Sequence, residues 1–91
     1  METKAIDLSH CDISDLAWRV INDHNARQKP IPPAAVPYLS AMRKCTDLTD
    51  QYGLDSAEGI VLRFLGNFTT ARGDVSKAVR EELKKRLRAH K

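Results

Sequence analysis

The chain of 91 residues contains three histidines and two cysteines, which are the side chains that most often hold structural zinc. Structural zinc sites use ligand pairs spaced about two to four residues apart, and no pair here has that spacing. No metal is therefore expected, and because no secretory signal precedes them, the cysteines are expected to be reduced thiols. The residues considered are His10, Cys11, His24, Cys45 and His90.

Two acidic pairs, Asp12 with Asp15 and Asp47 with Asp50, have the spacing of one helical turn. Such pairs could do acid/base chemistry, but helix capping and solvation explain them more simply. No Ser, Cys or Lys lies in a nucleophile motif, and the four glycines are spread along the chain rather than gathered in a phosphate-binding loop. The sequence therefore predicts a protein that is not an enzyme and takes no cofactor or small-molecule substrate.

Charge is unevenly distributed between the two parts of the chain. Residues 1–62 carry nine acids and six bases, a net charge of −3, whereas residues 63–91 carry nine bases and three acids, a net charge of +6. A basic carboxyl-terminal part indicates an acidic partner, either a protein surface or a nucleic acid. The candidate binding residues are Arg72, Lys77, Lys84, Lys85, Arg88 and Lys91.

Composition predicts one globular domain spanning residues 1–91. The chain is 42% hydrophobic and 30% charged, close to the average for globular proteins. The longest apolar run, Ile60 to Leu62, is far shorter than the ~18 residues of a membrane span. We therefore expect a cytoplasmic protein, and its size and plain organisation are typical of small accessory proteins of bacteria, phages and plasmids.

The segment Asp55–Phe68 is expected to be the central element, because it holds both phenylalanines. Its apolar residues recur at the spacing of one helical face. They are Ala57, Ile60, Val61, Phe64, Leu65 and Phe68. The opposite side carries the small residues Ser56, Gly59 and Gly66 beside Arg63, which would let another helix approach closely. That helix could belong to a second subunit, or it could be the first or last helix of the same chain.

A first helix is expected to follow a lead-in over residues 1–8, with Ser9 or Asp12 as its cap. It should end within Asn22–Asn25, since Asn and Asp favour competing backbone hydrogen bonds. Trp18 lies beside the apolar stripe, where it either widens the buried face or stays partly exposed to contact a base or a protein partner. The stripe consists of Ile13, Leu16, Ala17, Val20 and Ile21.

A proline-rich connector over residues 28–33 is expected to separate the first two helices by a fixed, extended spacer. The second helix should begin within Pro33–Pro37 and continue through Tyr52, with Gly53 as its left-handed terminator. Its apolar face comprises Tyr38, Ala41, Met42, Cys45, Leu48 and Tyr52.

Asp55 is then expected to cap the third helix at once, with Glu58 completing a capping box. The second and third helices would meet at a sharp corner, as in a helix-turn-helix. However, the helix that would read the bases is the most apolar one in the chain, which argues against specific DNA recognition.

The last helix is expected to begin with Asp74 as its cap. Glu81 with Lys85 and Glu82 with Arg86 have the spacing of ion pairs along a helix, which accounts for part of the basic run. The expected apolar stripe is narrow and consists of Val75, Ala78, Val79, Leu83 and Leu87.

These patterns predict an all-α fold, a compact bundle of four helices with the third helix, about 55–69, at its centre. The function that fits is a small protein-protein interaction module, either monomeric or homodimeric. It would use its basic last helix, or a surface formed by Trp18, Ser56, Gly59, Arg63 and Gly66. The alternative is a nucleic-acid-binding accessory protein that contacts phosphates through the last helix without reading sequence.

Overall fold

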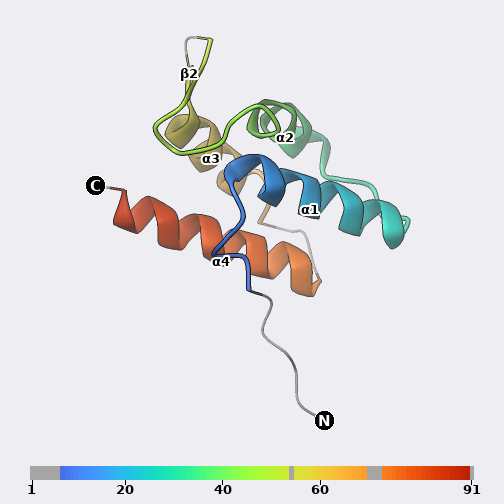
Figure 1. Cartoon of the computed structure of the whole chain (residues 1–91). Helices are drawn as coiled ribbons and strands as arrows, with labels where there is room; N and C mark the ends of the chain where they lie inside the picture. Colours follow the sequence, from blue (N-terminus) through green and yellow to red (C-terminus); the bar gives the residue numbers. More distant parts are fainter. Residues whose placement is uncertain (1–6, 54, 70–72, 91) are drawn as a thin grey trace.

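The computed structural model describes residues 7–53, 55–69 and 73–90, and it is an all-helical bundle as predicted. Its helices are α1 (Ile13–Ala26), α2 (Val36–Met42), α3 (Ala57–Gly66) and α4 (Asp74–Ala89). A short 3-10 helix, η1 (Pro33–Ala35), precedes α2. Helices α1 and α4 lie side by side and run in opposite directions, with α2 and α3 packed over them (Figure 1).

The centre of the core is the inner face of α3, which confirms the predicted role of this segment. Phe64 and Phe68 are fully buried, and their rings stack with centroids 4.6 Å apart. From α1 and α4, side chains such as Leu16 and Leu83 close over the same cluster. The opposite face of α3 is in solvent, so α3 is central on one side only.

Helix α1 begins after Asp12, one of the two caps that the sequence predicts, and it ends later than predicted. Asp12 is the cap, and its carboxylate accepts a hydrogen bond from the Asp15 backbone N–H. The Asp15 carboxylate in turn accepts a hydrogen bond from the Asp12 backbone N–H. The predicted end within Asn22–Asn25 is wrong, because the helix continues to Ala26. Its last turn is held by burial of His24, whose Nδ1 donates to the Val20 carbonyl oxygen at 3.0 Å.

The prediction that the second helix continues through Tyr52 is wrong, since α2 ends at Met42. After it, the Asp50 carboxylate accepts backbone hydrogen bonds from Thr46 at 2.6 Å and Asp47 at 3.1 Å, which folds the chain into turns. These two bonds lower the pKa of Asp50. An aspartate that binds nearby amides in this way competes with the helix.

Two short strands follow, β1 (Gln51–Tyr52) and β2 (Asp55–Ser56), which pair antiparallel. They form a hairpin that projects from the bundle (Figure 1). Gly53 has the predicted positive φ of 63°, but it lies in this hairpin and does not terminate a helix. The expected sharp corner between the second and third helices, and with it the helix-turn-helix arrangement, is therefore wrong.

The predicted cap of the third helix is also wrong by one residue. Ser56 caps α3 by accepting a hydrogen bond from the Gly59 backbone at 3.1 Å. Asp55 cannot serve as the cap because it pairs with Tyr52 in the hairpin. Glu58 lies in the first turn of the helix, where a negative charge is favoured by the helix dipole.

The prediction of Asp74 as the cap of the last helix is wrong, because α4 starts one residue earlier than that cap implies. Gly73 occupies the capping position with φ of 107°, and Asp74 is the first helical residue. A side chain at Gly73 would also collide with the Arg27 guanidinium, since a Cβ there would lie 2.9 Å from Nη1. The predicted apolar stripe does face the core, and buried Ser76 lies on the same side.

Among the described residues, no helix has both the length and the apolar character needed to cross a membrane.

Candidate binding surfaces

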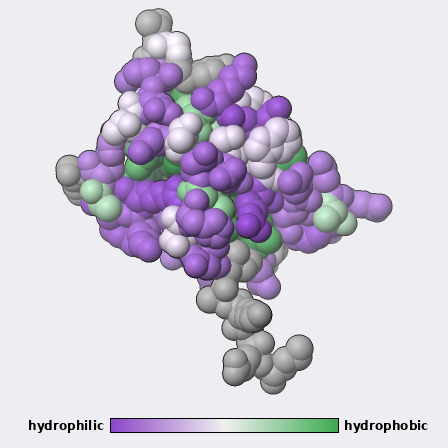
Figure 2. Space-filling view, in the orientation of Figure 1, coloured by the Kyte–Doolittle hydropathy of each residue, from purple (hydrophilic) through white to green (hydrophobic). Residues whose placement is uncertain are grey.

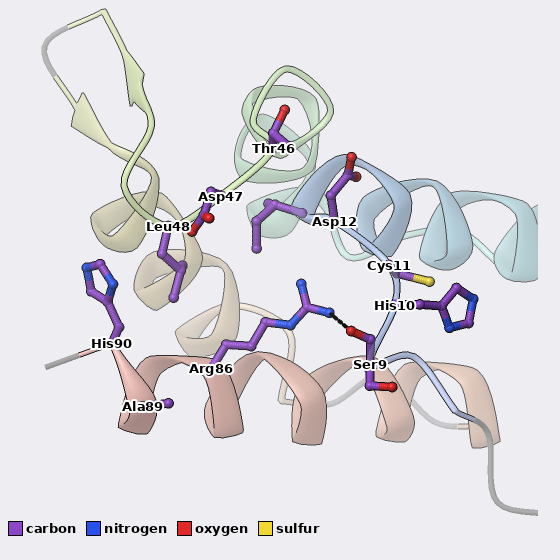
Figure 3. Close-up of a pocket in the computed structure, with 11 residues that line it drawn as sticks. Ser9, His10, Cys11, Asp12, Thr46, Asp47, Leu48, Arg86, Ala89 and His90 are labelled. Atoms are coloured by element: carbon purple, nitrogen blue, oxygen red, sulfur yellow. Dashed lines mark hydrogen bonds between the residues drawn. The ribbon is translucent and has the colours of Figure 1, made fainter.

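A surface depression with a volume of 470 Å³ is formed by three segments far apart in sequence. Residues 9–13 form one wall, residues 46–48 form another, and the end of α4 forms the floor (Figure 3). Arg86 reaches into the middle of it from α4, while the His90 side chain lies at the other end (Figure 3). The depression therefore depends on how residues 9–13 are held against α4.

Arg86 holds that segment in place. Its Nε donates to the Glu82 carboxylate at 2.7 Å, which confirms the predicted pair, and its Nη2 donates to the carbonyl oxygens of Leu8 at 2.9 Å and Ser9 at 3.5 Å. The Leu8 side chain is buried beneath these bonds. Arg86 thus works mainly as a clamp between the segment that precedes α1 and helix α4.

Two of the residues with metal-binding chemistry, His24 and Cys45, are buried and make contacts within the fold. His24 is buried against Phe68, with ring centroids 5.8 Å apart, and the Cys45 thiol donates to the Ala41 carbonyl oxygen at 3.5 Å. Burial raises the pKa of the Cys45 thiol. In the part of the chain that the structure describes, His, Cys, Asp and Glu side chains do not gather in groups of three or more that could hold a metal.

The bases of α4 divide into two sets. Four of the predicted binding residues are exposed along the helix, and we call them the basic face: Lys77, Lys84, Lys85 and Arg88. Arg72 and Lys91 lie outside the described residues. Arg86 and Arg80 belong to the second set, since Arg80 extends over Phe68 and its Nη1 donates to the Phe68 carbonyl oxygen at 3.4 Å.

Three of the four residues of the basic face form a row along α4. At 100° per residue, Lys77, Lys84 and Arg88 lie within about 20° of one line along α4, and the row is about 16 Å long. Within the described residues, no acidic side chain pairs with any of these three at 4.0 Å or less. Two exposed acids of α4, Asp74 and Glu81, lie on the same side of the helix. The structure therefore gathers these bases instead of scattering them.

The outer face of α3 carries the small residues that the sequence marked as an interface. Gly66 is exposed, and a Cβ built there would meet nothing within 4 Å. Leu62 beside it is 54% exposed. The expectation that the first or last helix of the same chain fills this surface is wrong, because the inner face of α3 takes those contacts. Ser56 lies at the edge of this outer face, and its hydroxyl oxygen already accepts the capping hydrogen bond of α3.

Arg63 also lies on this outer face, where its Nη1 is 3.4 Å from the Asp55 carboxylate. Both side chains are more than half exposed, so the pair adds little stability.

Trp18 remains 41% exposed on α1. The Arg43 guanidinium lies over its ring, 4.3 Å from the centroid, which occupies one face of the indole. A second, smaller depression of 270 Å³ adjoins Trp18 and is lined by other α1 residues, including Arg19 and Asn22.

The face of the molecule drawn in Figure 2 is covered mostly by hydrophilic side chains, with small apolar areas between them.

Sequence reasoning paired Arg86 with Glu82 but missed its bonds to residues 8 and 9, and it assigned no role to Arg80. The helical positions held a usable signal: Arg86 follows Val79 by seven residues and Leu83 by three, so it borders the apolar stripe. Its carbonyl partners lie 77 and 78 residues away in sequence, and no local pattern indicates them.

Comparison with protein-family models, with curated proteins and with solved structures gave no match for this chain.

Proposed function

We propose that the protein is a cytoplasmic, non-enzymatic interaction module that binds an acidic protein surface through the basic face of α4. The observation that carries this proposal is the row of exposed bases, three of which have no ion-pair partner among the described residues. The other two bases of the helix, Arg80 and Arg86, already have partners within the fold. The helix thus keeps some charges for stability and presents others to solvent.

Exposed lysines and arginines suit electrostatic recognition. Charge complementarity speeds association and selects among partners, and its effect falls as salt rises. The backbone that carries the row is held in place, because the opposite side of α4 packs in the core through Val79 and Leu83. The helix itself therefore needs no ordering when a partner binds, and the entropic cost falls on the exposed lysine and arginine side chains.

Nucleic acid is the second candidate for the same surface. An exposed row of bases on a straight helix can contact phosphates without reading sequence. Helix α4 carries no aromatic residue on which unpaired bases could stack, so a duplex would be the expected form.

The test compares two charge-reversal variants of the full chain. K84E/R88E alters the basic face, and R19E/K29E alters exposed bases on other parts of the molecule. Each reversal subtracts two from the formal net charge of +3, so both variants have a net charge of −1. Wild type and both variants are immobilised, exposed to extract of the native host at low salt, and the captured proteins are quantified by mass spectrometry.

We expect an acidic protein that wild type and R19E/K29E retain, that K84E/R88E retains roughly tenfold less, and that high salt releases. Equal retention by the two variants would contradict the proposal, since net charge alone would then explain binding. A labelled duplex tested at ~50 mM salt decides the second candidate, because a phosphate-driven contact is strongest at low salt. A duplex that binds wild type and not K84E/R88E would replace the acidic protein as the ligand.

A further inference from the structure

The outer face of α3 has the residue pattern of one helix in a parallel coiled-coil pair. At 100° per residue, Gly59, Leu62 and Gly66 lie within about 60° of each other, and Glu58 and Arg63 flank them on opposite sides. In coiled-coil terms, Gly59 and Gly66 take position a, Leu62 takes d, Arg63 takes e and Glu58 takes g. All five lie on the side of α3 turned away from the buried phenylalanines, and none is buried.

We propose that this face binds the same face of a second copy of the chain, with the two α3 helices parallel. In a parallel pair, a residue at g faces the residue at e five positions later on the other helix. Glu58 of each copy then faces Arg63 of the other, which gives two opposite-charge pairs related by the twofold axis. In an antiparallel pair the g positions of the two helices lie on one side of the contact and the e positions on the other, so Glu58 could not meet Arg63 of the second copy. Charge complementarity therefore favours the parallel arrangement.

The apolar and small residues fit the same arrangement. Leu62 of one copy packs against Leu62 of the other, and this covers a side chain that is 54% exposed in the single chain. Gly59 and Gly66 lie about one helical turn before and after Leu62, and their lack of side chains lets the two backbones approach. Gly66 has no other explanation in the described structure: its φ is not positive, and a Cβ there would meet nothing within 4 Å.

Nothing within the described chain prevents Arg63 from reaching a second copy. Its contact with Asp55 is 3.4 Å long and joins two exposed side chains. Glu58 pairs with no base at 4.0 Å or less among the described residues. This surface is separate from the basic face of α4, and the inference does not rest on the proposed function.

The contact is small, so the dimer should be weak. Ten helical residues extend over about 15 Å, and an interface of that length falls in the class of transient contacts below ~1,200 Å². Molar mass is therefore measured by sedimentation equilibrium from ~10 μM to ~1 mM at low salt, the range in which a contact of this size is populated. We expect the mass of wild type to rise toward twice the monomer value.

The charge pairs are tested by reversal and exchange. R63E places a carboxylate against Glu58 of the other copy, and we expect the dissociation constant to rise roughly tenfold. The exchanged variant E58R/R63E restores two opposite-charge pairs, so its dissociation constant should return to within about threefold of wild type. R19E makes the same charge change as R63E on α1 and should leave dimerisation unchanged.

Thermal unfolding of each variant, followed by circular dichroism, shows that a change in mass does not come from loss of the fold. Wild type that stays monomeric at ~1 mM would overturn the proposal, because even a transient contact is populated there. A dimer that R63E leaves intact, or that E58R/R63E fails to restore, would overturn the parallel pairing. None of these results bears on capture of an acidic partner by α4, which is measured separately.

Discussion

Replacing Phe64 with alanine is expected to lower the free energy of unfolding by about 3–5 kcal/mol, the range for removing a large buried aromatic side chain. Phe64 is fully buried and stacks on Phe68, so its loss opens a cavity at the point where α3 meets the other helices. A domain of this size has a total stability of roughly 5–14 kcal/mol, so this one change removes a large share. Urea denaturation followed by far-ultraviolet circular dichroism measures the difference.

Leu62→Ala is the matched control, because Leu62 is on the same helix and faces solvent. Its effect should stay within about 0.5 kcal/mol when measured at low micromolar concentration, where the second copy is dissociated. Equal effects of the two substitutions would mean that the inner face of α3 is not the centre of the core.

Arg86→Ala is expected to cost about 1.5–3 kcal/mol, the range for hydrogen bonds that involve a charged group. The Glu82 and Arg86 side chains are only 13% and 21% exposed, so the carboxylate left behind loses its partner in a poorly solvated place. The Leu8 and Ser9 carbonyl oxygens also lose their donor. Besides denaturation, hydrogen exchange should show faster exchange over residues 8–12, because the clamp that holds them on α4 is gone.

Arg88→Ala removes the same type of side chain from the exposed side of α4, and its effect should lie within about 0.5 kcal/mol. If Arg86→Ala proved as mild, or left the exchange of residues 8–12 unchanged, the depression shown in Figure 3 would not depend on this clamp.

The sequence predicts the parts of the fold that are determined locally. The sequence limits the cap of α1 to Ser9 or Asp12, and in the structure Asp12 caps the helix through hydrogen bonds with neighbouring backbone groups. The central role of α3 follows from its apolar spacing and from the placement of both phenylalanines. Both are short-range patterns, and both are confirmed.

The largest error, the length of the second helix, involves competition between local and distant partners. The apolar spacing through Cys45 and Leu48 favours a longer second helix, and these side chains are buried as it implies. The backbone nevertheless leaves the helix, because Asp50 binds the amides of Thr46 and Asp47 and its own carbonyl oxygen accepts a bond from Ala57 at 2.8 Å. Helical periodicity shows which side chains are buried, and here it does not show that the backbone is helical.

For the candidate surfaces too, the sequence predicts what depends on a single helix and not what depends on packing between helices. Helical geometry places Lys77, Lys84 and Arg88 on one line, and their exposure agrees with that placement. Whether another helix covers the outer face of α3 depends on how the bundle closes, which a single sequence does not state. The exposure of Leu62 and Gly66 therefore emerges only from the structure.

The proposal that the basic face of α4 contacts an acidic partner is tested most directly by lysine footprinting. The full chain is acetylated in buffer and in extract of the native host at low salt, and the labelling of each lysine is compared by mass spectrometry. We predict that Lys77, Lys84 and Lys85 are protected in extract while Lys29, which is exposed in the connector, labels equally in both. Equal labelling of all four lysines in buffer and extract, or protection of Lys29 alone, would contradict the account.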